Sequence, residues 1–142
     1  MSVEENKAVI RRLTEEFDKK NFAIVEELST PSAIFYYPGN EPWDREAQQG
    51  FYKAFSAAFP DHQHTIEEQI AEGDKVVTRW TIRGTHNGDL QGIAPTGKQV
   101  TIEATVIDHM VGGKIQEHRV FYDMLGLLQQ LGAVPTLGQG GS

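Results

Sequence analysis

Four ionisable side chains near the end of the chain have the types and spacing for proton transfer. The pair Gly112-Gly113 predicts a two-residue hairpin turn, which places Val111 opposite Lys114. Because side chains alternate between the two faces of a strand, this register gathers the ionisable groups on one otherwise apolar face. They are Asp108, Glu117, Arg119 and Asp123, with Phe121 among their apolar neighbours. A carboxylate against apolar walls has a raised pKa, which suits acid–base catalysis near neutral pH.

Asp123 has two interpretations that the sequence leaves open. It stands where the last strand meets the helical segment MLGLLQQL, so its carboxyl group is expected at the rim or floor of a pocket. Aspartate is also a favoured residue at the N-cap of a helix, and the same position suits that structural role. Glu117 and Arg119, two residues apart, are more typical of a structural ion pair than of a catalytic one.

The five histidines are the other candidates for proton transfer near neutral pH. His86 follows a strand and shares its parity with Trp80, so both are expected to point toward the helices. In the hairpin register, His109 and His118 fall on the face opposite Asp123. The motif His62-Gln63-His64 follows a helix end without a third metal ligand nearby, and we expect both histidines to be exposed to solvent.

The elements that must position these groups follow an α+β order. Apolar periodicity and the capping box Ser2–Glu5 predict helices over 2–17, 23–28, 44–59 and 124–131. Alternating segments with turn residues between them predict strands over 33–37, 65–71, 75–85, 100–111 and 114–122. We expect one domain over 1–137, a curved antiparallel sheet wrapped around the N-terminal helices and enclosing an apolar pocket, with a frayed tail over 138–142.

Composition excludes several classes of function. The 142 residues carry a net charge of −7 without a basic stripe, which argues against nucleic-acid binding. The absence of cysteine excludes disulfides and thiol catalysis, and no segment is a signal peptide or an apolar membrane span. No phosphate-binding or nucleophile-elbow motif occurs. We therefore expect a cytoplasmic protein without metal or cofactor, either an enzyme acting on a small molecule or a binding protein.

Several segments together resemble a known family. They are the opening ENKAVIRR, the stretch FPDHQHTIEEQIAEGDKVVTRWTIRGTH, the turn GIAPTGKQV, and the closing GGKIQEH…D…LLQQLG. From about Glu5 to Gly132 the chain is similar to SnoaL-like polyketide cyclases of the NTF2-like superfamily. The resemblance implies a cone-shaped α+β fold, usually dimeric through the sheet. It also implies an intramolecular aldol ring closure on a carbonyl-bearing ligand without metal or organic cofactor.

The resemblance also suggests roles for particular residues. An aspartate at the position of Asp123 acts as general acid/base in characterised cyclases, and His109 is the residue nearest to a polar side chain that polarises substrate carbonyls. Two positions depart from the family pattern, since Tyr36 stands where many relatives have histidine and Arg119 where many have tryptophan. A guanidinium beside Asp123 would lower the pKa of that carboxyl group.

Three functions follow, in decreasing order of preference. In the first, a cyclase or isomerase, Asp123 moves a proton next to a carbonyl group while Arg119, His86 or Tyr36 holds the enolate oxygen. The second is a non-catalytic protein that binds an apolar ligand or serves as a dimeric accessory domain. The third is epoxide opening by water that Asp108, Arg119 and Asp123 activate. The expected ligand-binding residues are Arg119, Tyr36, Trp80, Phe121, Glu117 and Asp108.

Overall fold

Four helices and five strands make up the computed structural model, which describes residues 2–135. The helices are α1 (Val3–Asp18), α2 (Ile24–Leu28), α3 (Arg45–Ala58) and α4 (Met124–Leu131). The strands are β1 (Ser29–Tyr36), β2 (Gln63–Glu72), β3 (Lys75–Thr85), β4 (Gln99–Val111) and β5 (Lys114–Tyr122). All predicted elements are present, and β1 begins earlier than expected. The tail predicted over 138–142 lies outside the described residues.

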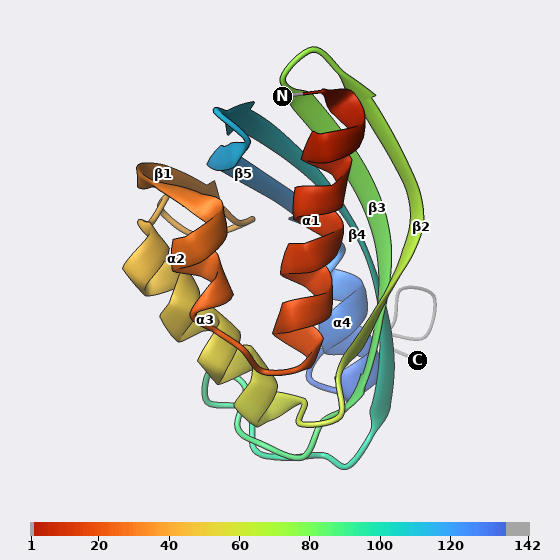
Figure 1. The fold of residues 1–142 in the computed structure, drawn as a ribbon. Helices are drawn as coiled ribbons and strands as arrows, with labels where there is room; N and C mark the ends of the chain where they lie inside the picture. Colours follow the sequence, from red (N-terminus) through yellow and green to blue (C-terminus); the bar gives the residue numbers. More distant parts are fainter. Residues whose placement is uncertain (1, 136–142) are drawn as a thin grey trace.

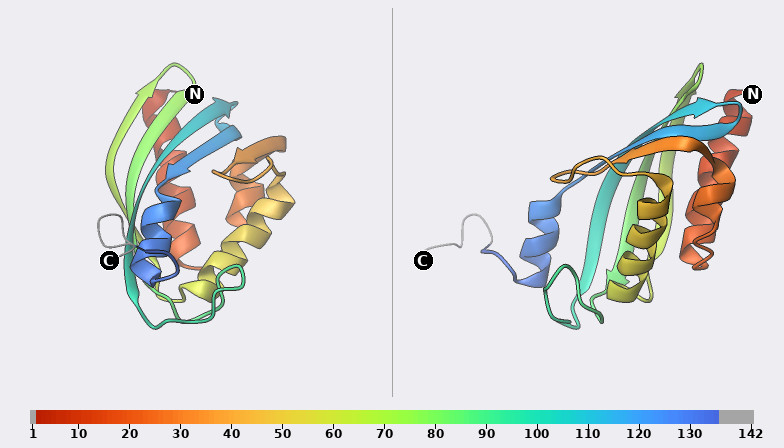
Figure 2. Two further views of the ribbon diagram at one scale, coloured as in Figure 1. Left: turned by 180° about the vertical axis from the view of Figure 1, so that it is seen from behind. Right: turned by 90° about the vertical axis from the view of Figure 1, so that its left-hand side faces the viewer.

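The strands form one curved, open sheet in the order β1-β5-β4-β3-β2 (Figure 1). Strands β2 to β5 are antiparallel neighbours, as the tight turns between them predicted. Strand β1 instead pairs in parallel with β5, and α3 with three strands forms the long connection that a parallel pair requires. Figures 1 and 2 show that the sheet bends around the helices, which confirms the predicted α+β architecture.

The helices cover the concave side of the sheet. Helix α1 packs against β2 and β3, α3 packs against β1, and α4 packs against β4. The predicted capping box begins α1, where the Ser2 hydroxyl accepts from the Glu5 amide at 3.1 Å and the Glu5 carboxylate accepts from the Ser2 amide at 3.2 Å. The apolar stripe of α1, with Ile10, Leu13 and Phe17 buried, faces the core as the periodicity indicated.

A β-bulge changes the register of the β4–β5 hairpin after two residue pairs. Gly112 and Gly113 have φ values of 59° and 79°, as a tight hairpin turn requires, and Val111 pairs with Lys114 as predicted. Met110 still pairs with Ile115, but His109 pairs with Glu117, so Gln116 is an extra residue in β5. The Gln116 side-chain oxygen accepts a hydrogen bond from the Thr30 hydroxyl at 2.7 Å. Every β5 side chain beyond the bulge therefore lies on the face opposite to the predicted one.

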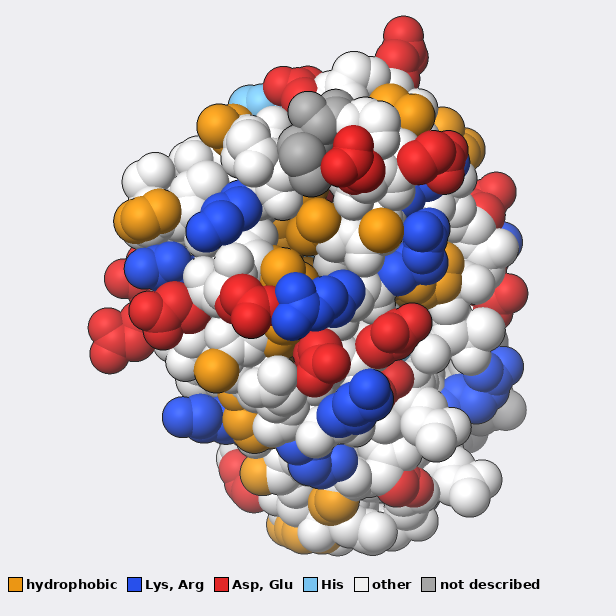
Figure 3. All heavy atoms as spheres, in the orientation of Figure 1, with side chains coloured by type: hydrophobic (Ala, Val, Ile, Leu, Met, Phe, Trp, Pro, Cys, Tyr) orange, Lys and Arg blue, Asp and Glu red, His pale blue; other side chains and the backbone are white. Residues whose placement is uncertain are grey.

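The surface over α1, α2 and α3 carries acidic and basic side chains interspersed with one another (Figure 3). This face has no extended basic stripe, in agreement with the scattered acidic residues of the sequence. Among residues 2–135, no helix is long and apolar enough to cross a membrane.

Candidate active site

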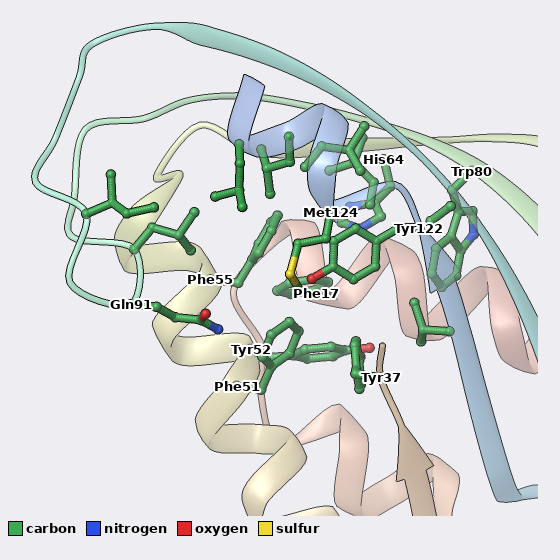
Figure 4. A pocket seen from close by; sticks show the side chains of 18 residues that line it. Phe17, Tyr37, Phe51, Tyr52, Phe55, His64, Trp80, Gln91, Tyr122 and Met124 are labelled. Atoms are coloured by element: carbon green, nitrogen blue, oxygen red, sulfur yellow. The ribbon is translucent and has the colours of Figure 1, made fainter. Parts of the chain in front are cut away.

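An apolar pocket lies between the concave side of the sheet and the helices. Its walls come from α1, α3, α4, the four antiparallel strands and the loop before β4 (Figure 4). The cavity has a volume of about 150 Å³, which is room for about one aromatic ring. Its polar groups are few, and among the described residues no aspartate or glutamate lines it. The lining side chains that can exchange or donate a proton are Tyr37, Tyr52, His64, Trp80, Gln91 and Tyr122.

His64 is the pocket-lining imidazole, and the end of α1 orients it. Its Nδ1 lies 2.7 Å from the Oδ1 atom of Asp18, and its backbone amide donates to Oδ2 of the same carboxylate at 2.7 Å. Since a carboxylate only accepts hydrogen bonds, Nδ1 carries the proton and Nε2 is left with a lone pair. The rings of Phe17 and Trp80 pack against the imidazole, with centroids at 5.1 and 5.5 Å. His64 thus has the tautomer and the support of a general base.

The buried residue His62 contacts the same carboxylate group of Asp18. Its Nδ1 lies 2.9 Å from Asp18 Oδ1, and its Nε2 lies 2.7 Å from the Ser56 hydroxyl oxygen. When Nδ1 donates to Asp18, the Ser56 hydroxyl donates to Nε2, and both ring nitrogens of His62 have a partner. His62 is 2% exposed and the His64 side chain 3%, so the prediction that both histidines face solvent was wrong.

Asp18 remains an anion within this cluster. Burial acts to raise the pKa of the carboxyl group, but the hydrogen bonds from His62 and His64 outweigh it and hold the pKa well below its ordinary range. A fixed negative charge at Nδ1 favours the imidazolium that forms when Nε2 takes a proton. The carboxylate therefore fixes the tautomer and the orientation of the His64 imidazole at the pocket wall.

A second network of hydrogen bonds leaves the Tyr37 hydroxyl group free to donate its proton. The Trp43 indole nitrogen, which can only donate, does so to the Gln48 amide oxygen at 2.8 Å. The Gln48 amide nitrogen must then donate to the Tyr37 hydroxyl oxygen, 2.7 Å away. The Tyr37 proton is therefore free to point to another acceptor. Burial raises the pKa of Tyr37 well above its usual range, so the hydroxyl keeps this proton at neutral pH.

Asp123 caps helix α4. Its carboxylate accepts a hydrogen bond from the backbone amide of Gly126 at 2.8 Å, and the residue is exposed. Its neighbours Tyr122 and Met124 line the pocket, whereas Asp123 does not. The geometry thus gives Asp123 the capping contact that the sequence left as an alternative.

Replacing Asp123 with alanine is expected to lower the free energy of unfolding by about 1 kcal/mol, because the Gly126 amide loses its acceptor. Asparagine also caps helices well, so Asp123→Asn is the matched control and should stay within a few tenths of a kcal/mol of the wild type. Urea unfolding followed by circular dichroism measures both variants. Equal stability of the alanine variant and the wild type would contradict the capping role.

The bulge removes three expected ligand-binding residues from the pocket face. Glu117, Arg119 and Phe121 lie on the outer face of the sheet, because the extra residue in β5 reverses their orientation. Arg119 lies over the ring of Tyr36 with 3.8 Å between its guanidinium carbon and the ring centroid. The prediction that these three side chains face the pocket with Asp108 was therefore wrong. The set Asp108, Arg119 and Asp123, considered for epoxide opening, is not assembled.

His109 lies on the outer face, as its parity predicted. Its Nε2 is 2.8 Å from an Asp74 carboxylate oxygen, and its Nδ1 is 4.0 Å from a Glu117 carboxylate oxygen. Phe121 on the same face is 54% exposed. The expected dimer through the sheet stays a prediction for this face.

Three expected site residues lie on the inner side. Trp80 lines the pocket. His86 is fully buried against the ring of Phe59, and its Nδ1 accepts from the Thr96 amide at 3.2 Å, which orders the loop before β4. Asp108 is fully buried and lies 2.5 Å from His118 Nδ1, and neither of the two lines the pocket. His118 faces inward instead of outward because it follows the bulge.

Sequence reasoning missed Asp18, His64 and Tyr37 as site residues. One signal was present for the histidines, because His62, His64 and Ile66 share one parity in a strand whose apolar face must turn inward. Asp18 and Tyr37 carried no comparable signal. Asp18 is one of many acidic residues on α1, and 46 residues separate it from the histidine that it orients.

Comparison with known proteins gives a consistent family. A family model described as SnoaL-like polyketide cyclase matches residues 7–131. The aklanonic acid methyl ester cyclase DnrD of Streptomyces peucetius is 30% identical over 131 residues, which are 87% of this chain and 88% of the relative. The corresponding cyclase AcmA of Streptomyces galilaeus is 38% identical over 80 residues, so that match covers 56% of this chain and only 54% of the relative.

Solved structures agree with this assignment of the fold. AclR of Streptomyces galilaeus superposes with a TM-score of 0.87 at 27% identity, covering 96% of this chain and 86% of its own. IdmH of Streptomyces antibioticus superposes with a TM-score of 0.80 at 31% identity, covering 89% of this chain and 98% of its own. The structural matches and the family match therefore cover nearly the same part of the chain.

Proposed function

The chain belongs to the SnoaL-like polyketide cyclase family, and from this premise we propose that it closes a ring in a carbonyl-bearing aromatic substrate by general acid–base catalysis. The observation that carries the proposal is the His64–Asp18 pair at the pocket wall. It supplies a base with a free lone pair in an otherwise apolar site. Asp123 and His109 lie outside the pocket lining, so the proposal assigns the proton transfer to His64.

The proposed reaction is an intramolecular aldol addition. Nε2 of His64 removes a proton from a carbon next to a carbonyl group, and the carbanion is stabilised as an enolate. That carbon attacks a second carbonyl carbon of the same molecule, so that a carbon–carbon bond forms and the second carbonyl oxygen becomes an alkoxide. The alkoxide takes the proton back from the His64 imidazolium. Asp18 stabilises the imidazolium between these steps.

Tyr37 is the proposed donor to the enolate oxygen. Gln48 occupies a lone pair of the Tyr37 hydroxyl, so its proton remains available to a ligand in the pocket. A donor that is fixed before the reaction stabilises developing negative charge without reorganisation, and the effect is large in a site with few other polar groups. Tyr52 and Tyr122, whose pKa values burial also raises, line the same pocket as further neutral hydroxyls.

The lining favours a flat aromatic substrate. Phe17 and Tyr52 are stacked with ring centroids 3.8 Å apart, and Phe51 and Phe55 continue this aromatic wall. The cavity holds about one ring, which we assign to the part of the substrate that reacts. Leu90, Gln91 and Ile93 of the loop before β4 close one side, and the rest of a polycyclic substrate is expected to extend past them.

Incubation with aklanonic acid methyl ester, the compound in the name of the relative DnrD, tests the proposal directly. We expect ring closure faster than in buffer, measured by chromatography and NMR, with deuterium from D₂O entering the carbon next to the carbonyl. A panel of other aromatic β-keto esters extends the test to related substrates. Binding of these compounds, seen as quenching of tryptophan fluorescence, without ring closure or deuterium exchange would support the non-catalytic alternative.

Replacing Tyr37 with phenylalanine is expected to lower kcat by about 10²–10³-fold with a small change in KM, because the enolate oxygen loses its donor in the transition state. The phenyl ring keeps the stacking on Trp43, whose centroid lies 5.0 Å away. Tyr36→Phe is the matched control, since Tyr36 lies against Arg119 on the outer face. An equal loss in both variants would contradict the role of Tyr37.

A further inference from the structure

We propose that Asp18, His62 and His64 also form a binding site for a divalent transition-metal ion, and that such an ion inhibits the enzyme. One ligand atom from each residue faces a common point, and these atoms lie within 4.8 Å of one another. Two imidazole nitrogens and one carboxylate oxygen are a ligand set typical of Zn²⁺ and its neighbours in the first transition series. Binding of the ion is independent of the proposed reaction, whereas inhibition rests on it.

The geometry needs only a small expansion to admit the ion. Asp18 Oδ1 lies 2.9 Å from His62 Nδ1 and 2.7 Å from His64 Nδ1. Around a tetrahedral Zn²⁺ ion with bonds of about 2.0–2.2 Å, ligand atoms lie about 3.3–3.6 Å apart. Each of these two distances must therefore lengthen by about 0.4–0.9 Å. Three protein ligands leave the fourth position of the ion for a water molecule.

The surroundings already supply the outer contacts that metal sites use. Ligand histidines usually donate their second N–H to a protein acceptor, and Ser56 Oγ lies 2.7 Å from His62 Nε2 for this purpose. The His64 backbone amide holds the second carboxylate oxygen of Asp18 at 2.7 Å, which leaves Oδ1 directed at the two imidazoles. The cluster reaches solvent through the Asp18 side chain, which is 22% exposed.

Two other histidine–carboxylate groups show why this cluster is distinct. His109 contacts Asp74 through Nε2 and Glu117 through Nδ1, so its two carboxylates lie on opposite edges of the ring and cannot share an ion. Within the described part of the chain, His118 contacts one carboxylate, that of Asp108. Among residues 2–135, only the cluster at the end of α1 brings three potential ligand atoms together.

Inhibition follows from the tautomer that the ion requires. A metal ion binds the lone pair of Nδ1, so the proton of each imidazole must move to Nε2. In His62 this proton is accepted by Ser56, whose hydroxyl changes from donor to acceptor. In His64 the new Nε2–H replaces the lone pair that the proposed reaction needs. The ion therefore converts the base into a donor without entering the pocket.

Isothermal titration of the untagged, EDTA-treated protein with ZnCl₂ tests the site. We expect one Zn²⁺ per chain and no comparable binding of Mg²⁺, which prefers oxygen ligands. Ser56→Ala should weaken Zn²⁺ binding by about 10–100-fold, as loss of an outer contact does. Asp18→Asn and His62→Gln should weaken it further, because each removes a ligand. His109→Gln, which alters an exposed histidine–carboxylate contact outside the cluster, should bind Zn²⁺ as the wild type does.

Nitrogen-15 NMR of the histidine rings provides a readout other than activity. His64 is expected to carry its proton on Nδ1 without the ion and on Nε2 with Zn²⁺ bound. Circular dichroism shows whether each variant is folded, and Ser56→Ala keeps the test available if His62→Gln does not fold. Zn²⁺ binding that is absent, that survives Asp18→Asn, or that is lost in His109→Gln would overturn the site.

The same titration separates this proposal from the proposed function. Binding of Zn²⁺ through the cluster together with loss of ring closure supports both. Binding through the cluster while ring closure continues unchanged supports the site and contradicts His64 as the base. Active enzyme that shows no change in the NMR signals of His64 at saturating Zn²⁺ overturns the site and leaves the proposed function standing.

Discussion

Replacing His64 with glutamine is expected to lower kcat for ring closure by about 10²–10⁴-fold, the range for loss of a positioned general base. Glutamine fills a similar space against Phe17 and Trp80 and can still bond Asp18, so the fold and ligand binding are expected to persist. Stopped-flow absorbance of the cyclised product gives kcat, and tryptophan fluorescence gives the affinity of a ligand that cannot cyclise. Normal affinity with lost turnover would identify His64 as part of the chemistry.

Asp123→Asn, assayed beside His64→Gln, decides between the two candidate bases. The resemblance to the family assigns the general acid/base to Asp123, whereas the geometry places its carboxylate on the Gly126 amide and outside the pocket lining. Asparagine keeps this cap, so any loss of turnover would come from chemistry and not from unfolding. Full turnover in His64→Gln together with a large loss in Asp123→Asn would contradict the proposal and restore the role expected of Asp123.

The second large effect is expected from Asp18→Asn, with a loss in kcat of up to about 10⁴-fold. An amide in place of the carboxylate no longer selects the Nδ1–H tautomer of His64, and it removes the charge that stabilises the imidazolium. The loss of the orienting carboxylate in serine proteases has an effect of about this size. Unlike His64→Gln, this variant leaves the imidazole in place, so NMR of the ring should show a changed tautomer.

The lowered pKa of Asp18 predicts that the free energy of unfolding depends on pH. The pKa of Asp18 is lowered in the folded protein, so the unfolded chain binds more protons when the pH falls below about 4. The contribution of Asp18 to the free energy of unfolding is therefore complete above that pH, and it is lost as the pH falls toward the folded-state pKa. Unfolding of the wild type and Asp18→Asn at a series of pH values should show their difference shrinking in this acid range. A difference that grows with acid would contradict the network.

The elements of the fold were largely predictable because they depend on local patterns. The alternation of β3 and β4 and the apolar stripe of α1 each determine one buried face without reference to the rest of the chain. The tight turn at Gly112-Gly113 likewise depends on two residues that tolerate positive φ. The residues that form the site could not be predicted in this way, because they come from α1, β2 and the segment after β1.

The β-bulge explains most of the errors about individual side chains. The face on which a side chain lies can be predicted from its position along a strand only while the pairing is regular. A single extra residue at Gln116 reversed Glu117, Arg119 and Phe121, and it brought His118 inward to Asp108. The residue that stabilises the bulge, Thr30, is separated from Gln116 by 86 positions. No residue pattern within the hairpin itself predicts the contact between Thr30 and Gln116.

The four charged residues of the β4–β5 hairpin region, Asp108, Glu117, Arg119 and Asp123, show what the sequence alone does not determine. By itself the sequence determined the family, the order of the elements and an apolar pocket, since these depend on periodicity and on motifs distributed over the whole chain. Only the tertiary structure decided which polar groups meet at that pocket. Asp18 reaches His64 because α1 packs on β2, and a contact between distant elements depends on their packing and not on either local pattern.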